Sequence, residues 1–347
     1  MKGPGPGSRF RRLVGVGGIG AGVVFSLEGD HDLGRNESRP GRLLDVRDYC
    51  KLHIIAHYPA VLLGARPGGL PFHVVPVGKV GDDETGQRLL REMGEAGMDL
   101  RFVRAVPGRP TLQSVCFQYP DGSGGNITTT DSAASALTAA DVEEAAALLD
   151  EGTIALAAPE VPLVARARLL EEATRRGAFR AATLTSAEAA AVRASGLLAH
   201  VELLALNEDE ASALGGVRFD PADPRPCLEA CAALRSGTPP QVVVSAGRRG
   251  AFALAEGRLE SRPAARVPVK STAGAGDALL GGILTGLAAG APFGDAFTLG
   301  MCAAAFSVAS PHTIPEGLSL DALAVFAREH RVELPSALGR LVLEARA

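Results

Sequence analysis

The chain has 347 residues and a formal net charge of −4 at pH 7. Its composition, 46% hydrophobic and 21% charged with 42 glycines and 23 prolines, is typical of a compact α/β protein with many tight turns. Acidic and basic residues are mixed along the chain, so neither nucleic acid nor a membrane surface is an expected partner. The five cysteines are sparse and odd in number, which favours reduced thiols in a cytoplasmic protein over a disulfide framework.

The first motif is the glycine-rich stretch "RLVGVGGIGAGVVFSL", residues 12–27. Gly15, Gly17 and Gly20 match the G-x-G-x-x-G pattern of dinucleotide-binding folds, and the arginines before the apolar run resemble the start of a signal peptide. No small-residue cleavage pattern follows, and the residues after the glycines are β-like rather than helical. We therefore predict a glycine-rich strand and neither of the two motifs.

From His73 onward, short apolar runs alternate with helical patterns. Apolar runs that predict strands begin at residues 73, 153, 180, 201 and 241; helical patterns cover residues 82–98 and 163–177, and a capping box predicts another helix at 138–141. This alternation indicates βαβ units and a mostly parallel sheet covered on both faces. Two segments interrupt it, and we predict a lid from about residues 23–48 and 102–130 within a single domain spanning residues 1–347.

The stretch "VPVKSTAGAGDALLGGILTGLAAG", residues 267–290, carries the chemistry. It predicts a β-like run ending at Lys270, then a loop of small residues, and a helix from Ala278 onward. The residues Gly274, Ala275 and Gly276 allow backbone N–H groups to converge at the helix start, where the helix dipole also favours anions. Asp277 in the first turn is suited to take a proton from a hydroxyl while phosphate charge develops beside it. The plainer interpretation is a tight turn in which Asp277 only caps the helix.

The segment "STAGAGD", residues 271–277, resembles the G-A-G-D signature of the ribokinase-like, or PfkB-type, family of sugar and nucleoside kinases. Segments 77–86 (VGKVGDDETG), 206–214 (LNEDEASAL) and 242–252 (VVVSAGRRGAF) match family segments in the same order, and the resemblance covers roughly residues 13–309. It implies a three-layer α/β fold with a mostly parallel central sheet and a small β-sheet lid. It also implies phosphoryl transfer from ATP to an alcohol, with Asp277 as the general base and residues 274–276 as the anion hole.

The resemblance also assigns the nucleotide side of the site. Asn207 and Glu210 would organise Mg²⁺ and phosphate, with Glu210 acting on the metal through water. The other nucleotide-binding positions it implies are Ser245, Gly247, Gly250 and Thr272. Asp82 and Asp83 are interpreted as helix-start residues rather than a catalytic pair. Ser271 stands where the family often has Asp, which weakens the case for K⁺ activation but leaves it open.

The substrate side departs from the family. Gly20 and Gly22 stand where many members carry an acid that binds sugar hydroxyls, and residues 48–65 replace the usual G-G-x-x-x-N loop. Lys51 falls near the usual ligand position, where a cation favours an acidic or phosphorylated acceptor. With Asn126, these are the predicted substrate-binding residues. His53 and His57 have H-x-x-x-H spacing on a predicted helix, but structural histidines are favoured over a zinc site because no Glu stands between them.

These observations favour an ATP-dependent kinase for a small sugar or sugar-like compound, acting as a homodimer through the lid. Two alternatives stay open: a nucleoside kinase of the same fold, and a catalytically silent relative that binds nucleotide or another ligand. An oxidoreductase based on the first glycine motif ranks last.

Overall fold

The computed structural model describes residues 9–69, 71–120, 124–235, 240–332 and 334, so residues 121–123 of the predicted lid lie outside the described part. The strands are β1 (Arg12–Val16), β2 (Gly20–Leu27), β3 (Gly41–Tyr49), β4 (His73–Gly81), β5 (Phe102–Val106), β6 (Leu112–Gln118), β7 (Gly124–Thr128), β8 (Thr153–Ala157), β9 (Phe179–Ala182), β10 (Leu203–Asn207), β11 (Gln241–Ser245), β12 (Ala251–Ala255) and β13 (Arg258–Arg262). The α-helices are α1 (Lys51–Leu62), α2 (Glu84–Glu95), α3 (Ala139–Ala145), α4 (Leu163–Arg175), α5 (Ala189–Ser195), α6 (Glu208–Gly215), α7 (Arg225–Ala232), α8 (Ala275–Ala288), α9 (Phe293–Val308) and α10 (Leu320–Glu329).

A nine-stranded sheet forms the centre of the body, in the order β13-β12-β11-β10-β9-β8-β1-β4-β5. The strands from β11 to β5 pair in parallel, and the β11–β12–β13 end is antiparallel. Buried strands alternate their side chains between the two faces. In β1, Leu13 packs in the cluster that contains α1, α2 and α8, whereas Val14 and Val16 pack with α3 and α4. This confirms the predicted mostly parallel sheet between two layers of helices.

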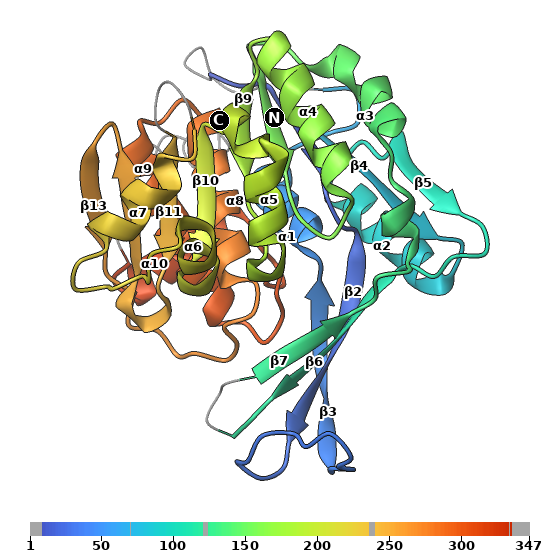
Figure 1. Cartoon of the computed structure of the whole chain (residues 1–347), viewed down its shortest axis with the longest axis vertical. Coiled ribbons are helices and arrows are strands. Elements are labelled where there is room, and N and C mark those ends of the chain that lie inside the picture. The colour runs from blue at the N-terminus through green and yellow to red at the C-terminus, as the bar shows by residue number, and fades with distance from the viewer. Residues whose placement is uncertain (1–8, 70, 121–123, 236–239, 333, 335–347) are drawn as a thin grey trace.

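A separate four-stranded sheet, hereafter the small sheet, has the order β3-β2-β6-β7 and projects from the body, as Figure 1 shows. Strands β2 and β6 are parallel, and β3 and β7 pair antiparallel with them at the two edges. The predicted lid segment 102–130 begins too early, because Phe102–Val106 forms β5 and pairs in parallel with β4 in the large sheet. As an edge strand, β5 is only partly buried, so its pattern resembles that of an exposed lid strand.

The glycine-rich stretch, residues 12–27, holds β1 and the whole of β2, and no helix follows the glycines directly, which agrees with the rejection of the dinucleotide motif. The predicted β-like run before Lys270 is wrong, because residues 263–270 belong to no strand. Pro263 and Pro268 lack backbone N–H groups, which disfavours pairing in a sheet. Asp83 is the N-cap of α2, as predicted, and its side chain accepts a hydrogen bond from Gly86 N at 2.8 Å.

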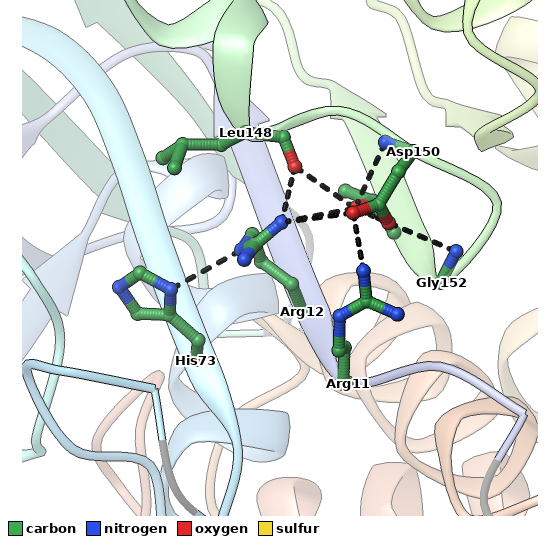
Figure 2. Close-up of polar contacts among 7 residues, drawn as sticks. Arg11, Arg12, His73, Leu148, Asp150 and Gly152 are labelled. Carbon is green, nitrogen blue, oxygen red and sulfur yellow. Dashed lines mark hydrogen bonds and ion pairs between the residues drawn. The ribbon is translucent and has the colours of Figure 1, made fainter.

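A polar network joins the amino ends of β1, β4 and β8 (Figure 2). Arg12 donates from Nε to His73 Nδ1 at 3.2 Å and from its guanidinium to the Leu148 carbonyl. The Asp150 carboxylate pairs with Arg11 and accepts hydrogen bonds from Gly152 N at 3.0 Å and Thr153 Oγ1 at 2.9 Å. The side chains at this end of the sheet thus bind one another, whereas a cavity lies at the carboxyl ends of β10 and β11, where Asn207 and Ser245 line it.

Candidate active site

The loop before α8 places its backbone at the carboxyl end of the large sheet. Gly274 is the N-cap of α8 and has φ 76°, a left-handed conformation that side-chain-bearing residues rarely adopt. A Cβ at this position would also come within 2.9 Å of Thr313 Cβ and 3.0 Å of the Thr313 carbonyl oxygen. The turn therefore requires glycine. The N–H of Ala275, the first residue of this 14-residue helix, donates to the Thr272 carbonyl at 3.4 Å, and the N–H groups that follow it lie at the helix start, where an anion can accept their hydrogen bonds.

Asp277, in the first turn of α8, contacts a residue from the other end of the chain. Lys51 Nζ, at the first position of α1, lies 3.5 Å from Asp277 Oδ1 and 3.7 Å from Glu210 Oε1. The backbone N–H of Lys51 donates to Glu160 Oε2 at 3.3 Å. Helices α1, α6 and α8, together with the loop after β8 that carries Glu160, thus bring one ammonium group and three carboxyl groups together.

The Asn207 and Glu210 pair has a structural role at the start of α6. Glu210 N donates to Asn207 Oδ1 and Asn207 N donates to Glu210 Oε2, both at 2.8 Å, which is a reciprocal capping box. Glu210 is also buried, with 5% of its surface exposed, and its second carboxylate oxygen faces Lys51. The capping box therefore holds this carboxylate in a fixed orientation beside Asp277.

The carboxyl groups of the site have raised pKa values, mainly because they are buried. Burial raises the pKa of Asp277, and Lys51 opposes this shift. Burial, supported by the nearby Asp277 charge, raises the pKa of Glu160 to about 7. Burial alone would lower the pKa of Lys51, but the surrounding carboxylates Asp277, Glu210 and Glu160 raise it above its ordinary value. Lys51 is therefore a protonated ammonium group at neutral pH.

A cavity of about 890 Å³ opens on one side of Asp277. The predicted nucleotide-side residues line it: Asn207, Glu210, Ser245, Gly247, Gly250, Thr272, Gly274, Ala275 and Gly276. Gly250 follows the short 3₁₀ helix η5 (Gly247–Arg249) and has φ 90°; a Cβ there would lie 2.0 Å from the Arg262 carbonyl oxygen. The turn after β11 consequently depends on glycine at this position.

A second cavity of about 560 Å³ lies between the body and the small sheet. Asp48, Ser114, Cys116 and Asn126 line it from the small sheet, and Glu160 lines it from the body. Asp277, Gly274 and Thr272 line both cavities. The carboxylate of Asp277 and the start of α8 therefore stand where the two cavities meet.

Of the predicted substrate-binding residues, Asn126 lines the smaller cavity and Lys51 lines the larger one. Gly20 and Gly22 line neither. A Cβ on Gly20 would lie 2.4 Å from the Leu112 carbonyl oxygen, so this glycine serves the close packing of β2 on β6. Gly22 is the cross-strand partner of Asp48. The Lys51 charge lies against Asp277 and Glu210, so the expectation that it selects an acidic acceptor has no support in this arrangement.

Sequence reasoning missed two carboxylates of the smaller cavity, Asp48 and Glu160. Asp48 is the second-to-last residue of β3, shortly before α1. Burial raises the pKa of Asp48, and the hydrogen bond that Cys116 Sγ donates to its Oδ2 at 3.6 Å opposes this shift. Glu160 follows the buried strand β8 and has φ 72°, which is uncommon for a residue other than glycine and is often found at functional sites. For Glu160, the available signal was an acidic residue three positions after a buried parallel strand, because ligands bind at that edge of the sheet.

Comparison of this chain with known protein families gives a match over most of its length. The family model described as pfkB family carbohydrate kinase matches residues 61–318. Within the described residues, no helix combines the length and the apolar character needed to cross a membrane.

Solved structures share the fold at low sequence identity. The Cryptococcus neoformans ribokinase in complex with ADP is 22% identical, with a TM-score of 0.71 over 91% of this chain and 99% of that one. The Arabidopsis thaliana ribokinase complexed with ribose and ATP is 19% identical, with a TM-score of 0.68 over 96% and 98%. The adenosine kinase from Sinorhizobium meliloti is 19% identical, with a TM-score of 0.71 over 93% and 99%. At these identities the likeness establishes the fold.

Proposed function

The chain belongs to the pfkB family of carbohydrate kinases, and from this premise we propose that it transfers the γ-phosphate of ATP to a hydroxyl group of a small sugar or sugar-like compound. The observation that carries the proposal is the position of Asp277, Gly274 and Thr272, which line both the larger and the smaller cavity. A donor in one cavity and an acceptor in the other would have their reacting atoms at this junction, and such positioning supplies much of the rate in phosphoryl transfer.

In the proposed step, a hydroxyl of the acceptor lies beside Asp277. Its oxygen forms a bond to the γ-phosphorus while the bond from that phosphorus to the β–γ bridging oxygen breaks. The electron pair of the broken bond stays on ADP, and the hydroxyl proton passes to a carboxylate oxygen of Asp277. The raised pKa of Asp277 makes this carboxylate a stronger base than an exposed aspartate. The N–H groups of residues 274–276 donate to the phosphoryl oxygens.

The nucleotide side of the proposal rests on the larger cavity. Ser245, Gly247 and Gly250 line it at the turn after β11, where backbone can approach the nucleotide closely. Mg²⁺, if bound, would supply positive charge that neutralises the phosphate oxygens. The buried Glu210 carboxylate, held by its capping box with Asn207, would hold the ion through water.

The acceptor side is acidic. Asp48 and Glu160 face the smaller cavity as hydrogen-bond acceptors for hydroxyl groups, with Asn126 beside them. We propose that these residues bind the acceptor in place of the acid that the family carries on the strand of Gly22. Carboxylates repel anions, so neutral polyhydroxy compounds and amino sugars should be better acceptors than sugar acids and sugar phosphates.

The test is ATP-dependent phosphorylation of a panel of sugars, amino sugars, cyclitols, sugar acids, sugar phosphates and nucleosides, with Mg²⁺ and with or without K⁺. Asp277→Asn is the matched variant, since it keeps the shape of the side chain and removes the base. We expect one acceptor class to be phosphorylated and turnover to fall by about 10²–10⁴-fold in the variant, with ADP binding unchanged.

Preference for a nucleoside would shift the assignment to a nucleoside kinase of the same fold. ATP binding without phosphorylation of any compound would favour the catalytically silent relative. Near-normal turnover in Asp277→Asn would remove this residue as the general base, whichever acceptor is found.

A further inference from the structure

Lys51 occupies a special place among the basic residues of the larger cavity. The basic residues that line this cavity within the described part of the chain are Lys51, Arg248, Arg249 and Arg266. Of these, Lys51 is the one that contacts Asp277. Its side chain is 25% exposed, so it reaches the cavity while its stem is covered. Lys51 therefore presents a positive charge at the junction where the transferred group would pass.

The contacts of Lys51 leave it able to bind one more anion. An ammonium group has three N–H donors. Asp277 Oδ1 accepts one of them at 3.5 Å, and Glu210 Oε1 at 3.7 Å forms an ion pair beyond hydrogen-bond distance. Both contacts are longer than a strong charge-assisted hydrogen bond, so a phosphoryl oxygen entering from the larger cavity can accept a hydrogen bond from Lys51 Nζ and approach it more closely than either carboxylate does.

The negative charge of the carboxyl groups around Lys51 favours a cation at this position. Asp277, Glu210 and Glu160 all act electrostatically on Lys51, so three carboxyl groups lie near the place where a γ-phosphate would arrive. Each ionised carboxylate repels the phosphate, and the repulsion is strong in a partly buried site. One ammonium group held among them lowers this cost and attracts the charge that the phosphoryl oxygens carry during transfer.

We propose that Lys51 is a catalytic residue of this chain, whose ammonium group binds the oxygens of the transferred phosphoryl group between Asp277 and the start of α8. The claim that Lys51 takes part in catalysis rests on the proposed function. The claim that it binds the γ-phosphate does not, because binding of a γ-phosphate can be measured without an acceptor.

The first experiment is calorimetric binding of ADP and of a non-hydrolysable ATP analogue, at fixed Mg²⁺, to the wild type, Lys51→Met and Lys270→Met. Lys270 is the matched control, because it is an exposed lysine that lines the smaller cavity. We expect Lys51→Met to bind the ATP analogue about tenfold more weakly and ADP within twofold of the wild type, since only the analogue carries a γ-phosphate. Lys270→Met should bind both like the wild type.

Equal affinities of the wild type and Lys51→Met for the ATP analogue would overturn the proposal, as would an equal loss for both nucleotides. Methionine keeps most of the apolar part of the Lys51 side chain, so the packing around α1 should be preserved in this variant. If Lys51→Met does not fold, the same comparison is made with Lys51→Gln and Lys51→Arg, of which only the arginine variant should keep a preference for the analogue over ADP.

The second experiment measures turnover with whichever acceptor the panel identifies. Lys51→Met should lower kcat on the order of 10²-fold with a much smaller change in the acceptor KM. Faster turnover in Lys51→Met would show that the contact with Asp277 only restrains the base, and would overturn the catalytic role. If no acceptor is found while the selective loss of analogue binding is observed, the proposed function fails and the γ-phosphate contact of Lys51 stands.

Discussion

The carboxylate of Asp48 lies over the backbone of Gly22, so that a Cβ on Gly22 would come within 2.0 Å of Asp48 Oδ2. The two residues are cross-strand partners on β2 and β3. The acid of the small sheet thus comes from the neighbouring strand, and glycine leaves the space that it fills. Gly18 likewise leaves space for an acidic side chain, because a Cβ on Gly18 would lie 2.5 Å from Glu160 Cβ.

Gly22→Ala should displace the Asp48 side chain without unfolding the small sheet, because the first atom met is the end of a rotatable side chain. We expect the acceptor KM to rise about tenfold, in line with the loss of one hydrogen bond to a charged group, while ADP affinity stays the same. Steady-state kinetics and calorimetry check this. Asp48→Asn is the companion variant, and a large effect in it together with a normal KM in Gly22→Ala would contradict the displacement.

Gly274→Ala should abolish turnover, because it combines a left-handed backbone with a contact to the Thr313 backbone. Gly196→Ala is the matched control: Gly196 has φ 72°, but a Cβ there would meet nothing within 4 Å. Each substitution should cost about 1 kcal/mol in the free energy of unfolding from the backbone alone. Only Gly274→Ala should lose more stability and all activity. Equal losses of stability in Gly274→Ala and Gly196→Ala would mean that Thr313 moves aside for the new Cβ at little cost.

Glu160→Gln should stabilise the protein at alkaline pH. The pKa of Glu160 is raised from 4.5 to about 7 in the folded state, so the folded protein binds its proton more tightly than the unfolded chain does. Stability is therefore lost as pH rises from about 4.5 to about 7, and glutamine removes that loss. Urea unfolding should show equal stabilities at pH 4 and a gain of about 3 kcal/mol for the variant at pH 8, at about 1.4 kcal/mol for each unit of the pKa shift. A less stable variant at pH 8 would contradict the raised pKa.

His53→Leu should stabilise the protein at acidic pH. Neither ring nitrogen of His53 has a hydrogen-bond partner among the described residues, and burial, with the neighbouring His57, lowers its pKa well below 6.5. The unfolded chain binds this proton more readily, so the wild type loses stability as pH falls below about 6.5. The variant should lose less stability between pH 8 and pH 5 in urea unfolding. An identical pH dependence would mean that His53 is not buried in its neutral form.

The outer face of the small sheet should mediate dimer formation. Val23, Val115 and Ile127 are directly paired across β2, β6 and β7, and they are 44%, 44% and 71% exposed. An exposed apolar row of this kind favours association of two copies. Ultracentrifugation should show a dimer for the wild type and a monomer for Ile127→Lys. A monomeric wild type at micromolar concentration would contradict the expected homodimer.

Much of the fold follows from local patterns. The strands β8, β10 and β11 are short apolar runs, and the capping box of Thr138 and Asp141 starts α3 as expected. The edge strand β5 was predicted as part of the lid although it belongs to the large sheet. A strand that is half-buried at the edge of a large sheet and one that is half-buried in a lid have the same alternation of apolar and polar residues.

The sequence alone determined the family, the α/β class and the loop before α8, because these depend on segments that are continuous in the chain: a periodic apolar pattern, or small residues followed by Asp277. It could not assign the acceptor-side carboxylates Asp48 and Glu160, and it predicted Lys51 on the substrate side, whereas the structure places Lys51 in the larger cavity. All three residues are far from Asp277 in sequence, and each is an ordinary polar residue by itself. Only the tertiary structure brings Lys51 Nζ within 3.5 Å of Asp277 Oδ1 and places Asp48 over Gly22, because the packing of α1 on α8 and the register of β2 with β3 decide those contacts.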